Sequence, residues 1–270
     1  MSKLAVAVYL IDAFADRPFA GNAAAVCLLD GSADPAWMQA VADEFQQAAT
    51  VFVYEQGEGF GLRWFVPGRE LHLCGHGTMA AAHALWEAGQ IWPDAPARFH
   101  TASGVLSARR DGDLILLDFP AEPVRQVGPP LGLAEALRSE VHTVARGRLD
   151  YLVELASAAE VRAIVPDFAL LAQIETRGII VTARSDTPGY DIVSRFFAPS
   201  VGIDEDAVTG LAHCLLGPYW SAKLGKDTLT AYQASARGGV VRVRVADSRV
   251  ELGGQAVTVL RGSLLAPPTA

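Results

Sequence analysis

Apolar residues in the first part of the chain fall into short runs, partly alternating with polar residues, that are typical of β-strands. Four such runs, AVAVYLIDAF, AAAVCLLD, TVFVYEQ and LRWFV, occupy residues 5–14, 23–30, 50–56 and 62–66. The glycine-rich segment GEGFG separates the last two runs and predicts a hairpin turn. The opening of the chain is therefore predicted to be rich in β-structure.

Helical patterns interrupt these strands. Apolar residues recur with helical spacing from Trp37 to Phe45. Asp34 is a favoured capping residue and Pro35 suits a first helical position, so a helix is predicted from there to about Gln47. A second helix is expected in the alanine-rich segment MAAAHAL.

The chain length of 270 residues allows one large domain or two small ones. Proline-rich stretches at 92–96 and 118–130 punctuate the middle, and the second leads toward a further apolar, helix-like segment. We place the domain boundary there. An N-terminal lobe is expected to comprise residues 1–122, completed by 258–270, and a C-terminal lobe is expected to comprise residues 123–257.

Two short patterns occur twice, in the same order. Arg63-Trp-Phe-Val-Pro67 is echoed by Arg195-Phe-Phe-Ala-Pro199, and Ala82-His83 is echoed by Ala212-His213. The intervals between them differ by only two residues. Such a repeat is what an ancient internal duplication leaves behind, and it predicts two similar α/β halves.

Each half also has glycines at the start of a predicted helix. The first N–H groups of a helix lack intrahelical partners and carry partial positive charge, so they bind anions readily. Gly75, Gly77 and Gly210 have no side chain and would let a ligand approach that backbone closely. The two junctions together predict a site that clasps a small carboxylate, although a glycine before a helix is more often only part of a turn.

Composition narrows the possible partners. Hydrophobic residues make up 51% and charged residues 19%, which is typical of a globular chain, and no apolar run is long enough to span a membrane. The net charge of −8 and the lack of a Lys/Arg cluster argue against nucleic-acid binding. Cys27, Cys74 and Cys214 are odd in number and widely spaced, so we expect buried free cysteines and a cytoplasmic location.

Four segments resemble the phenazine-biosynthesis PhzF-like isomerases: IDAFADRPFAGNAAAV at 11–26, RWFVPGRELHLCGHGTMAAAHAL at 63–85, EDAVTGLAHCLLGPYW at 205–220 and QASARGG at 233–239. The resemblance implies an α/β (α+β) fold of the diaminopimelate epimerase type, in which each of two pseudo-symmetric lobes wraps a curved sheet around a central helix. It also implies a homodimer that needs no metal or organic cofactor. The expected activity is an isomerase or epimerase that moves a proton on a small carboxylate metabolite in the cleft between the lobes.

The resemblance further implies the catalytic residues. The family's Cys-Gly-His motif falls on Cys74-Gly75-His76, and its acidic residue before Thr-Gly falls on Asp206. His76 is expected to act as a base near neutral pH, with Asp206 orienting or charging its imidazole. As a purely structural alternative, His76 would hydrogen-bond the opposite half and Asp206 would cap a helix, a role for which Thr209 competes.

Two polar positions of the family's site carry apolar residues in this chain. The position of the family's acid/base Glu is Ala49, and that of its Ser is Leu211. Substrate is expected to meet these two residues and the backbone of Gly75, Gly77 and Gly210. Because a positioned acid/base contributes about 10²–10⁴-fold to the rate, the family's standard reaction is in doubt.

Two other functions stay open. A catalytically silent family member would keep the cleft and bind a metabolite, since Ala49 removes the acid/base group. A metal-dependent hydrolase would use His72, Cys74 and His76, which an extended strand would point to one face. The paired histidines of the repeat, His83 and His213, lie in apolar segments and are expected to belong to the core.

Overall fold

The computed structural model describes residues 5–266 and 268, and the chain divides into two compact units. Unit 1 consists of Met1–Asp118 and Gly253–Ala270, and unit 2 consists of Phe119–Leu252. Both boundaries fall a few residues before the predicted ones at 122 and 257. Two paired strands, β8 (Leu114–Pro120) and β17 (Arg249–Gly254), each contain residues of both units. The boundary therefore lies within these strands and not in the proline-rich stretch that follows β8.

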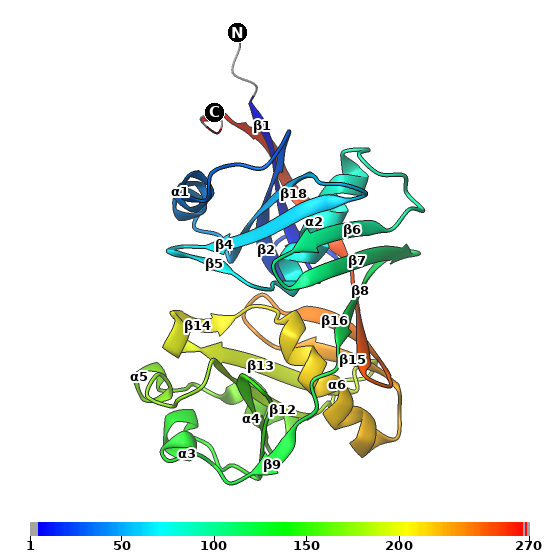
Figure 1. Ribbon diagram of the computed structural model, residues 1–270. Coiled ribbons are helices and arrows are strands. Elements are labelled where there is room, and N and C mark those ends of the chain that lie inside the picture. The colour runs from blue at the N-terminus through cyan, green and yellow to red at the C-terminus, as the bar shows by residue number, and fades with distance from the viewer. Residues whose placement is uncertain (1–4, 267, 269–270) are drawn as a thin grey trace. The chain divides into compact units, whose positions relative to one another are not determined.

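Unit 1 is a strongly β-rich unit with two helices (Figure 1). Its further strands are β1 (Val6–Ala13), β2 (Asn22–Leu29), β3 (Ala49–Glu55), β4 (Phe60–Val66), β5 (Arg69–Leu71), β6 (Ala97–Thr101), β7 (Gly104–Asp111) and β18 (Ala256–Leu264). Its helices are α1 (Pro35–Phe45) and α2 (Gly75–Glu87). The predicted strands and the hairpin between β3 and β4 are thus confirmed.

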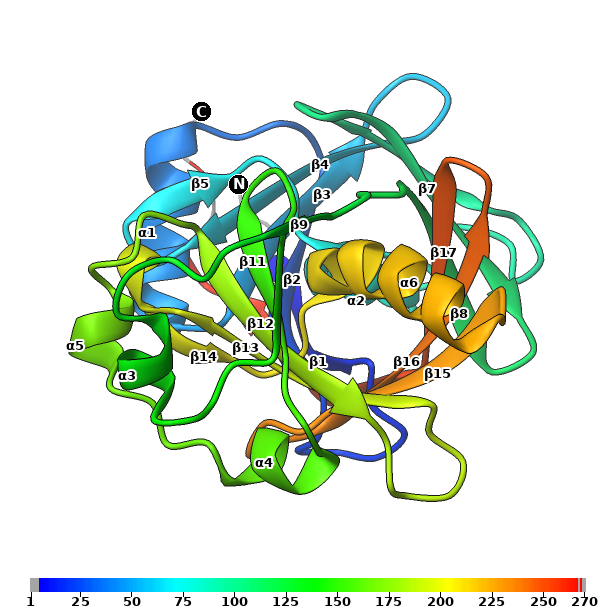
Figure 2. The same cartoon turned by 90° about the horizontal axis from the view of Figure 1, so that it is seen from below.

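Unit 2 has the same character, with more short helices (Figure 2). Its strands are β9 (Arg125–Val127), β10 (Thr143–Arg146), β11 (Asp150–Glu154), β12 (Gly178–Arg184), β13 (Ile192–Ala198), β14 (Ile203–Asp206), β15 (Thr228–Gln233) and β16 (Gly239–Ala246). Its helices are α3 (Leu133–Leu137), α4 (Ala158–Ala163), α5 (Phe168–Leu171), the 3₁₀-helix η1 (Pro199–Val201) and α6 (Gly210–Leu224).

The strand pairings of the two units follow one scheme. In unit 1, β2 and β3 are parallel, β4 is antiparallel to β3 and β5 and parallel to β6, and β7 is antiparallel to β6. In unit 2, β11 and β12 are parallel, β13 is antiparallel to β12 and β14 and parallel to β15, and β16 is antiparallel to β15. The long helices α2 and α6 occupy equivalent places in this order. The topology therefore repeats, as the duplicated sequence pattern predicts.

The repeated Arg-x-Phe motif forms the same local structure in both units. Arg63 makes two hydrogen bonds to Glu70, of 2.7 and 2.8 Å, and its guanidinium lies 5.3 Å from the centre of the Phe65 ring. Arg195 makes two bonds to Glu205, of 2.7 and 2.9 Å, and lies 4.9 Å from the ring of Phe197. A planar guanidinium matches a carboxylate fork and an aromatic face at once, which Lys cannot do.

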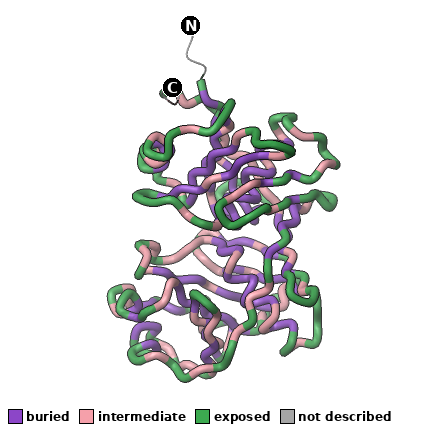
Figure 3. The backbone as a smooth tube through the Cα atoms, in the orientation of Figure 1, coloured by how far each residue is buried: buried purple, intermediate pink, exposed green. Residues whose placement is uncertain are grey.

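Each unit contains a long helix packed against its strands. All of α2 except His83 and Glu87 is buried, and the helix contacts β1, β2, β3, β7 and β18. A helix that is apolar all round has no solvent face, so it must lie at the centre of its unit. In unit 2, α6 contacts β11, β15 and β16. Figure 3 shows buried positions along the strands and exposed positions at the turns. This mixed α+β architecture confirms the predicted fold class.

The peripheral helix α1 is amphipathic. It begins after Asp34, whose carboxylate accepts a hydrogen bond of 3.2 Å from the Ala36 N–H, as the sequence predicts. It ends at Phe45, slightly before the predicted end, because Gln46 adopts a left-handed conformation with φ of 52°. In the part of the chain that the structure describes, no helix is long and apolar enough to cross a membrane.

Candidate functional site

The first half of the candidate site is the N-terminus of α2. Cys74 precedes the helix in an extended conformation and gives it no side-chain cap. The first backbone N–H groups, from Gly75 to Gly77, therefore start the helix without the usual side-chain oxygen, and the ladder begins with the 3.0 Å bond from the Thr78 N–H to the Cys74 carbonyl. An uncapped N-terminus of this kind has the polarity that favours an anion.

Gly75 and Gly77 of α2 were both predicted to let a ligand approach the helix backbone, but Gly77 has a packing role. A Cβ atom on Gly77 would lie 2.8 Å from the Trp64 ring and 3.1 Å from both the Cys74 sulfur and a Val51 methyl group. Gly77 is thus required for close packing of the helix on β3 and β4. Its backbone N–H remains part of the helix N-terminus, but its missing side chain makes room for the core and not for a ligand.

His76 is the titratable residue of this half. Its side chain is 7% exposed, and its Nδ1 lies 3.3 Å from the Nδ2 of Asn22, which is buried. The Cys74 sulfur lies 3.6 Å from Nδ1 and 3.8 Å from Nε2. Because an amide nitrogen can only donate, the Asn22 contact makes Nδ1 an acceptor and places the proton of the neutral ring on Nε2.

Sequence reasoning did not select Asn22. The residue begins β2, one position after Gly21, where φ is +62° and a Cβ would lie 2.2 Å from the Ala13 carbonyl oxygen. Upstream, the Asp12 carboxylate accepts a 2.6 Å hydrogen bond from the Phe19 N–H and so holds the loop before Asn22. A lone amide in the alanine-rich strand AGNAAAV was the available signal, since a buried amide needs partners.

Ala49 belongs to the same unit. It is the first residue of β3, pairs in register with Ala24 of β2, and has no exposed surface. Its methyl group can take no part in proton transfer, so this position supplies no acid/base group.

The second half of the candidate site precedes α6. Asp206 ends β14, and its Oδ2 accepts a 2.6 Å hydrogen bond from the Thr209 hydroxyl. Thr209 is the residue before Gly210, where a threonine commonly caps a helix, yet its side chain makes no capping bond; its hydroxyl donates to Asp206 and accepts from the Gln233 amide. The N-terminus of α6 is therefore left without a side-chain cap, like that of α2, and half-buried Leu211 follows in its first turn.

A half-buried cation, Arg177, contributes to the electrostatics around Asp206. Arg177 forms a bidentate pair with Asp150, which has no exposed surface. Burial lowers the pKa of Arg177, but the hydrogen bonds and charge of Asp150, with the charges of Glu122 and Asp206, raise it above its ordinary value. The surrounding carboxylates thus keep Arg177 positively charged.

The remaining histidines and cysteines behave differently from one another. His213 has no exposed surface, and burial lowers its pKa to about 4. His83 was predicted to be a core residue, but it is half-buried, with its Nε2 3.1 Å from the Thr258 hydroxyl and 3.5 Å from Glu87.

All three cysteines are buried and free, and burial raises the pKa of Cys27 and of Cys214 to about 12. Neither of these two thiols is a nucleophile.

The metal-site hypothesis fails on local geometry. His76 lies inside α2, so His72, Cys74 and His76 do not alternate along one strand. His72 is exposed, and its carbonyl accepts a 2.7 Å bond from the Ser103 hydroxyl. Among the described residues, no three His, Cys, Asp or Glu side chains are grouped as a metal would require.

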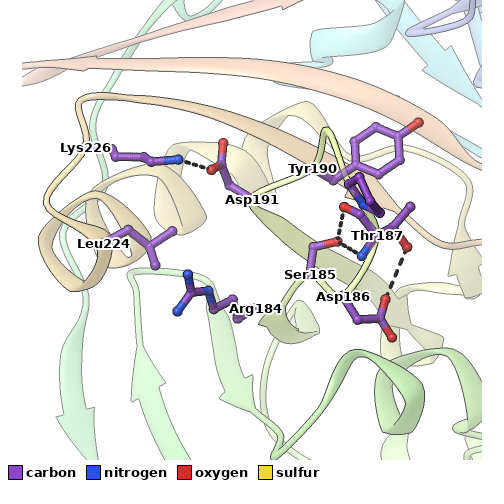
Figure 4. A pocket seen from close by; sticks show the side chains of 9 residues that line it. Arg184, Ser185, Asp186, Thr187, Tyr190, Asp191, Leu224 and Lys226 are labelled. Atoms are coloured by element: carbon purple, nitrogen blue, oxygen red, sulfur yellow. Dashed lines mark hydrogen bonds and ion pairs between the residues drawn. The ribbon is translucent and has the colours of Figure 1, made fainter.

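Three open cavities within the units, of about 330, 350 and 370 Å³, lie away from the predicted residues. Figure 4 shows the first of them, where Lys226 is paired with Asp191 and the Ser185 hydroxyl is bonded within its own loop. None of the seven predicted site residues lines any of the three. Their side-chain charges are largely paired, whereas the helix N-termini combine uncapped N–H groups with a titratable residue.

The Asn22 contact yields a prediction about the His76 ring. Wild-type protein labelled with ¹⁵N should show the Nε2–H tautomer of His76 in two-bond ¹H–¹⁵N correlation spectra, because Asn22 donates to Nδ1. Asn22→Asp, which can only accept when ionised, should move the ring proton to Nδ1. The control is Gln173→Glu, the same amide-to-carboxylate change at an exposed position, which should leave the His76 tautomer unchanged. A wild-type ring protonated at Nδ1 alone would contradict the assignment.

Comparisons with known proteins agree with the fold described above. The model of the phenazine biosynthesis-like protein family, PhzC-PhzF, matches residues 11–262. An uncharacterized isomerase of Halalkalibacterium halodurans is 49% identical over 259 residues, covering 96% of this chain and 98% of that protein. A crystal structure of a PhzF-family protein from Enterococcus faecalis is 36% identical, with a TM-score of 0.92 over 96% of this chain and 99% of that chain. A hydroxyproline epimerase from Agrobacterium vitis, 14% identical, shares the fold with a TM-score of 0.63 over 98% and 94% of the two chains. The chain therefore belongs to the phenazine biosynthesis-like protein family.

Proposed function

We propose that this protein is a cofactor-independent isomerase or epimerase that moves a proton on a small carboxylate metabolite. The observation that carries the proposal is the pair of uncapped helix N-termini, each with a titratable side chain: His76 on α2 and Asp206 before α6. The names of the relatives as isomerases support the reaction class. The expected homodimer and cytoplasmic location remain predictions.

The hydrogen bonds suggest roles that differ from those expected from the sequence. In the neutral ring, His76 accepts from Asn22 at Nδ1 and carries its proton on Nε2, so Nε2 has no lone pair with which to act as a base. Asp206 is then the group that takes the proton from a substrate carbon, leaving the electron pair delocalised toward the substrate carboxylate. Returning the same proton to another carbon, or to the other face, completes an isomerisation without net change in protons.

The negative charge that develops on the substrate needs donors in place before the reaction. Backbone N–H groups at Gly75, Gly77 and Gly210, together with the Nε2–H of His76, supply them. Preorganised donors of this kind stabilise a developing oxyanion by about 3–4 kcal/mol each. Half-buried Leu211 adds apolar surface, whereas Ala49 has no exposed surface, so we expect a substrate that is less polar where it meets Leu211 than those of relatives with a polar residue there.

The test is isotope exchange with metabolites that co-purify with the protein. Small carboxylates released by denaturation and identified by mass spectrometry are returned to fresh protein in heavy water. An isomerase should place deuterium at one carbon of at least one of them and generate an isomer of equal mass in light water. Return of the original proton without exchange is detected by the appearance of the isomer alone.

The competing function is a silent metabolite-binding protein, which the loss of a titratable group at Ala49 favours. It predicts that a co-purified carboxylate binds with a saturable affinity but yields neither deuterium incorporation nor an isomer. That result would overturn the isomerase proposal. Ala49→Glu in the same assay shows whether the missing acid/base group accounts for it.

A further inference from the structure

The segment QASARGG at 233–239 has no role in the mechanism above, yet it reaches the site through Gln233. Gln233 is the last residue of β15 and is 1% exposed. Its Oε1 accepts a 2.9 Å hydrogen bond from the Thr209 N–H. Its Nε2 donates to the Asp206 carbonyl at 2.8 Å and to the Thr209 hydroxyl at 3.3 Å. The buried amide of Gln233 thus binds both Asp206 and Thr209, which flank the loop that precedes α6.

These contacts fix the direction of the Thr209 hydroxyl. A hydroxyl has one proton to donate and lone pairs with which to accept. The amide N–H of Gln233 occupies the accepting side, so the Thr209 proton points to the Asp206 carboxylate, 2.6 Å away. Hydrogen bonds in such a chain polarise one another and hold a single arrangement more firmly than isolated bonds.

The same contacts keep the helix N-terminus open. Gln233 donates to the Thr209 hydroxyl oxygen, the atom that would otherwise accept a capping bond from the first turn of α6, and Thr209 makes no such bond. A second residue of the segment, Ser235, donates a 2.7 Å hydrogen bond to the Ala207 carbonyl and anchors the loop backbone independently. Simple anchoring of the loop therefore does not require Gln233.

We propose that Gln233 is a positioning residue that holds the Asp206 carboxylate in one rotamer through Thr209 and keeps the N-terminus of α6 uncapped. This inference deepens the proposed function and rests on it where catalysis is concerned. The positioning itself is a property of unit 2 alone, since all of these residues lie in Phe119–Leu252. It can therefore be measured without a substrate.

The experiment compares Thr209→Val, Thr209→Ser and Gln233→Met with wild-type protein and with Gln173→Met, an exposed control in the same unit. The readout is the three-bond coupling between Hα and the two Hβ of Asp206, which reports its χ1 rotamer. Wild type, Thr209→Ser and Gln173→Met should give the values of one rotamer. Thr209→Val and Gln233→Met should give averaged values, because the carboxylate loses its oriented donor.

The second readout is turnover in the isotope-exchange assay. Displacing a catalytic carboxylate should lower kcat by about 10-fold or more while KM changes by less than about threefold, and Thr209→Ser should restore most of the rate. A single Asp206 rotamer in folded Thr209→Val would overturn the inference, and this variant decides the question if Gln233→Met does not fold. Averaged couplings in a protein that never converts its ligand would uphold the positioning role and refute the proposed function.

Discussion

Replacing His76 with Asn is expected to lower turnover by about 10²-fold or more, because the Nε2–H that faces the substrate is lost. Asp206→Asn is expected to lower it at least as much, since the proposed proton carrier no longer titrates. Ligand affinity should stay within about tenfold of wild type, because the backbone donors of α2 and α6 remain. The measurement is the rate of isomer formation and of deuterium incorporation with a co-purified carboxylate.

His76→Gln separates the two possible roles of the imidazole. The Gln amide can place an N–H close to the position of the histidine Nε2, but it cannot act as a base at neutral pH. If His76 is a neutral donor, His76→Gln should retain about 10-fold more activity than His76→Asn. If His76 is the base, as expected from the sequence, both variants should be equally inactive.

Two matched variants control for nonspecific effects. His142→Asn and Asp204→Asn make the same changes at exposed positions and should leave turnover within about twofold of wild type. Activity that survives in both His76→Asn and Asp206→Asn would remove these residues from the mechanism. Thermal unfolding of every variant establishes that the protein folds.

The fold could be predicted because its signals are local. The strands follow from short apolar runs, and the start of α1 follows from Asp34 and Pro35, whose effects act within one turn. The duplication could be read from Arg63 and Arg195 because each repeated Arg holds an acidic partner and an aromatic ring nearby in sequence. Unit boundaries were misplaced by a few residues, since they depend on which strands pair.

The site could be predicted only as far as single residues and resemblance allow. The contacts of His76 with Asn22 and of Thr209 with Gln233 join residues that are distant in sequence, and they exist because α2 packs against β2 and α6 packs against β15. No spacing rule reveals such a contact. Gly77 was misread for the same reason, because the Trp64 ring that excludes a side chain there lies on another element.

The metal-site hypothesis failed where two periodicities meet. Alternation along a strand would place His72 and His76 on one face, but the helix begins at Gly75 and changes the period from 2 to 3.6. His83 was assigned to the core because its neighbours are apolar, yet Thr258 of β18 supplies a polar partner at the helix surface. The first error comes from extending a strand pattern into a helix, and the second from a polar partner on another element.

Stability is expected to fall by about 2 kcal/mol between pH 7.5 and pH 5 through His213 alone. Burial lowers the pKa of His213 from 6.5 to about 4. Above pH 6.5 the ring is neutral in both folded and unfolded chains, so it contributes no pH dependence. Below that pH the unfolded chain binds a proton that the folded chain refuses, and stability decreases until about pH 4, where the folded ring is protonated too.

The pKa of His213 is low because its ring is buried and has, among the described residues, no acceptor for a proton on its second nitrogen. His213 donates from Nδ1 to the Thr209 carbonyl at 2.8 Å, and its buried Nε2 has no hydrogen-bond partner within the described part of the chain. Protonating Nε2 would place an uncompensated charge on α6, one turn from the loop that holds Asp206. Acid should therefore destabilise the unit that contains α6 and Asp206.

The check is the free energy of unfolding in urea between pH 4.5 and 8 for wild type, His213→Asn and His142→Asn. His213→Asn keeps a donor near the position of Nδ1 but cannot be protonated, so its stability relative to wild type should improve by about 2 kcal/mol as the pH falls from 7.5 to 5. His142→Asn should follow the wild-type curve, because His142 is exposed. Parallel curves for His213→Asn and wild type would contradict the prediction, because they would show that the ring is not buried in its neutral form. Activity at pH 5 is a separate measurement: if it is lost in wild type and also in His213→Asn, the loss comes from the chemistry of the site and not from the protonation of His213.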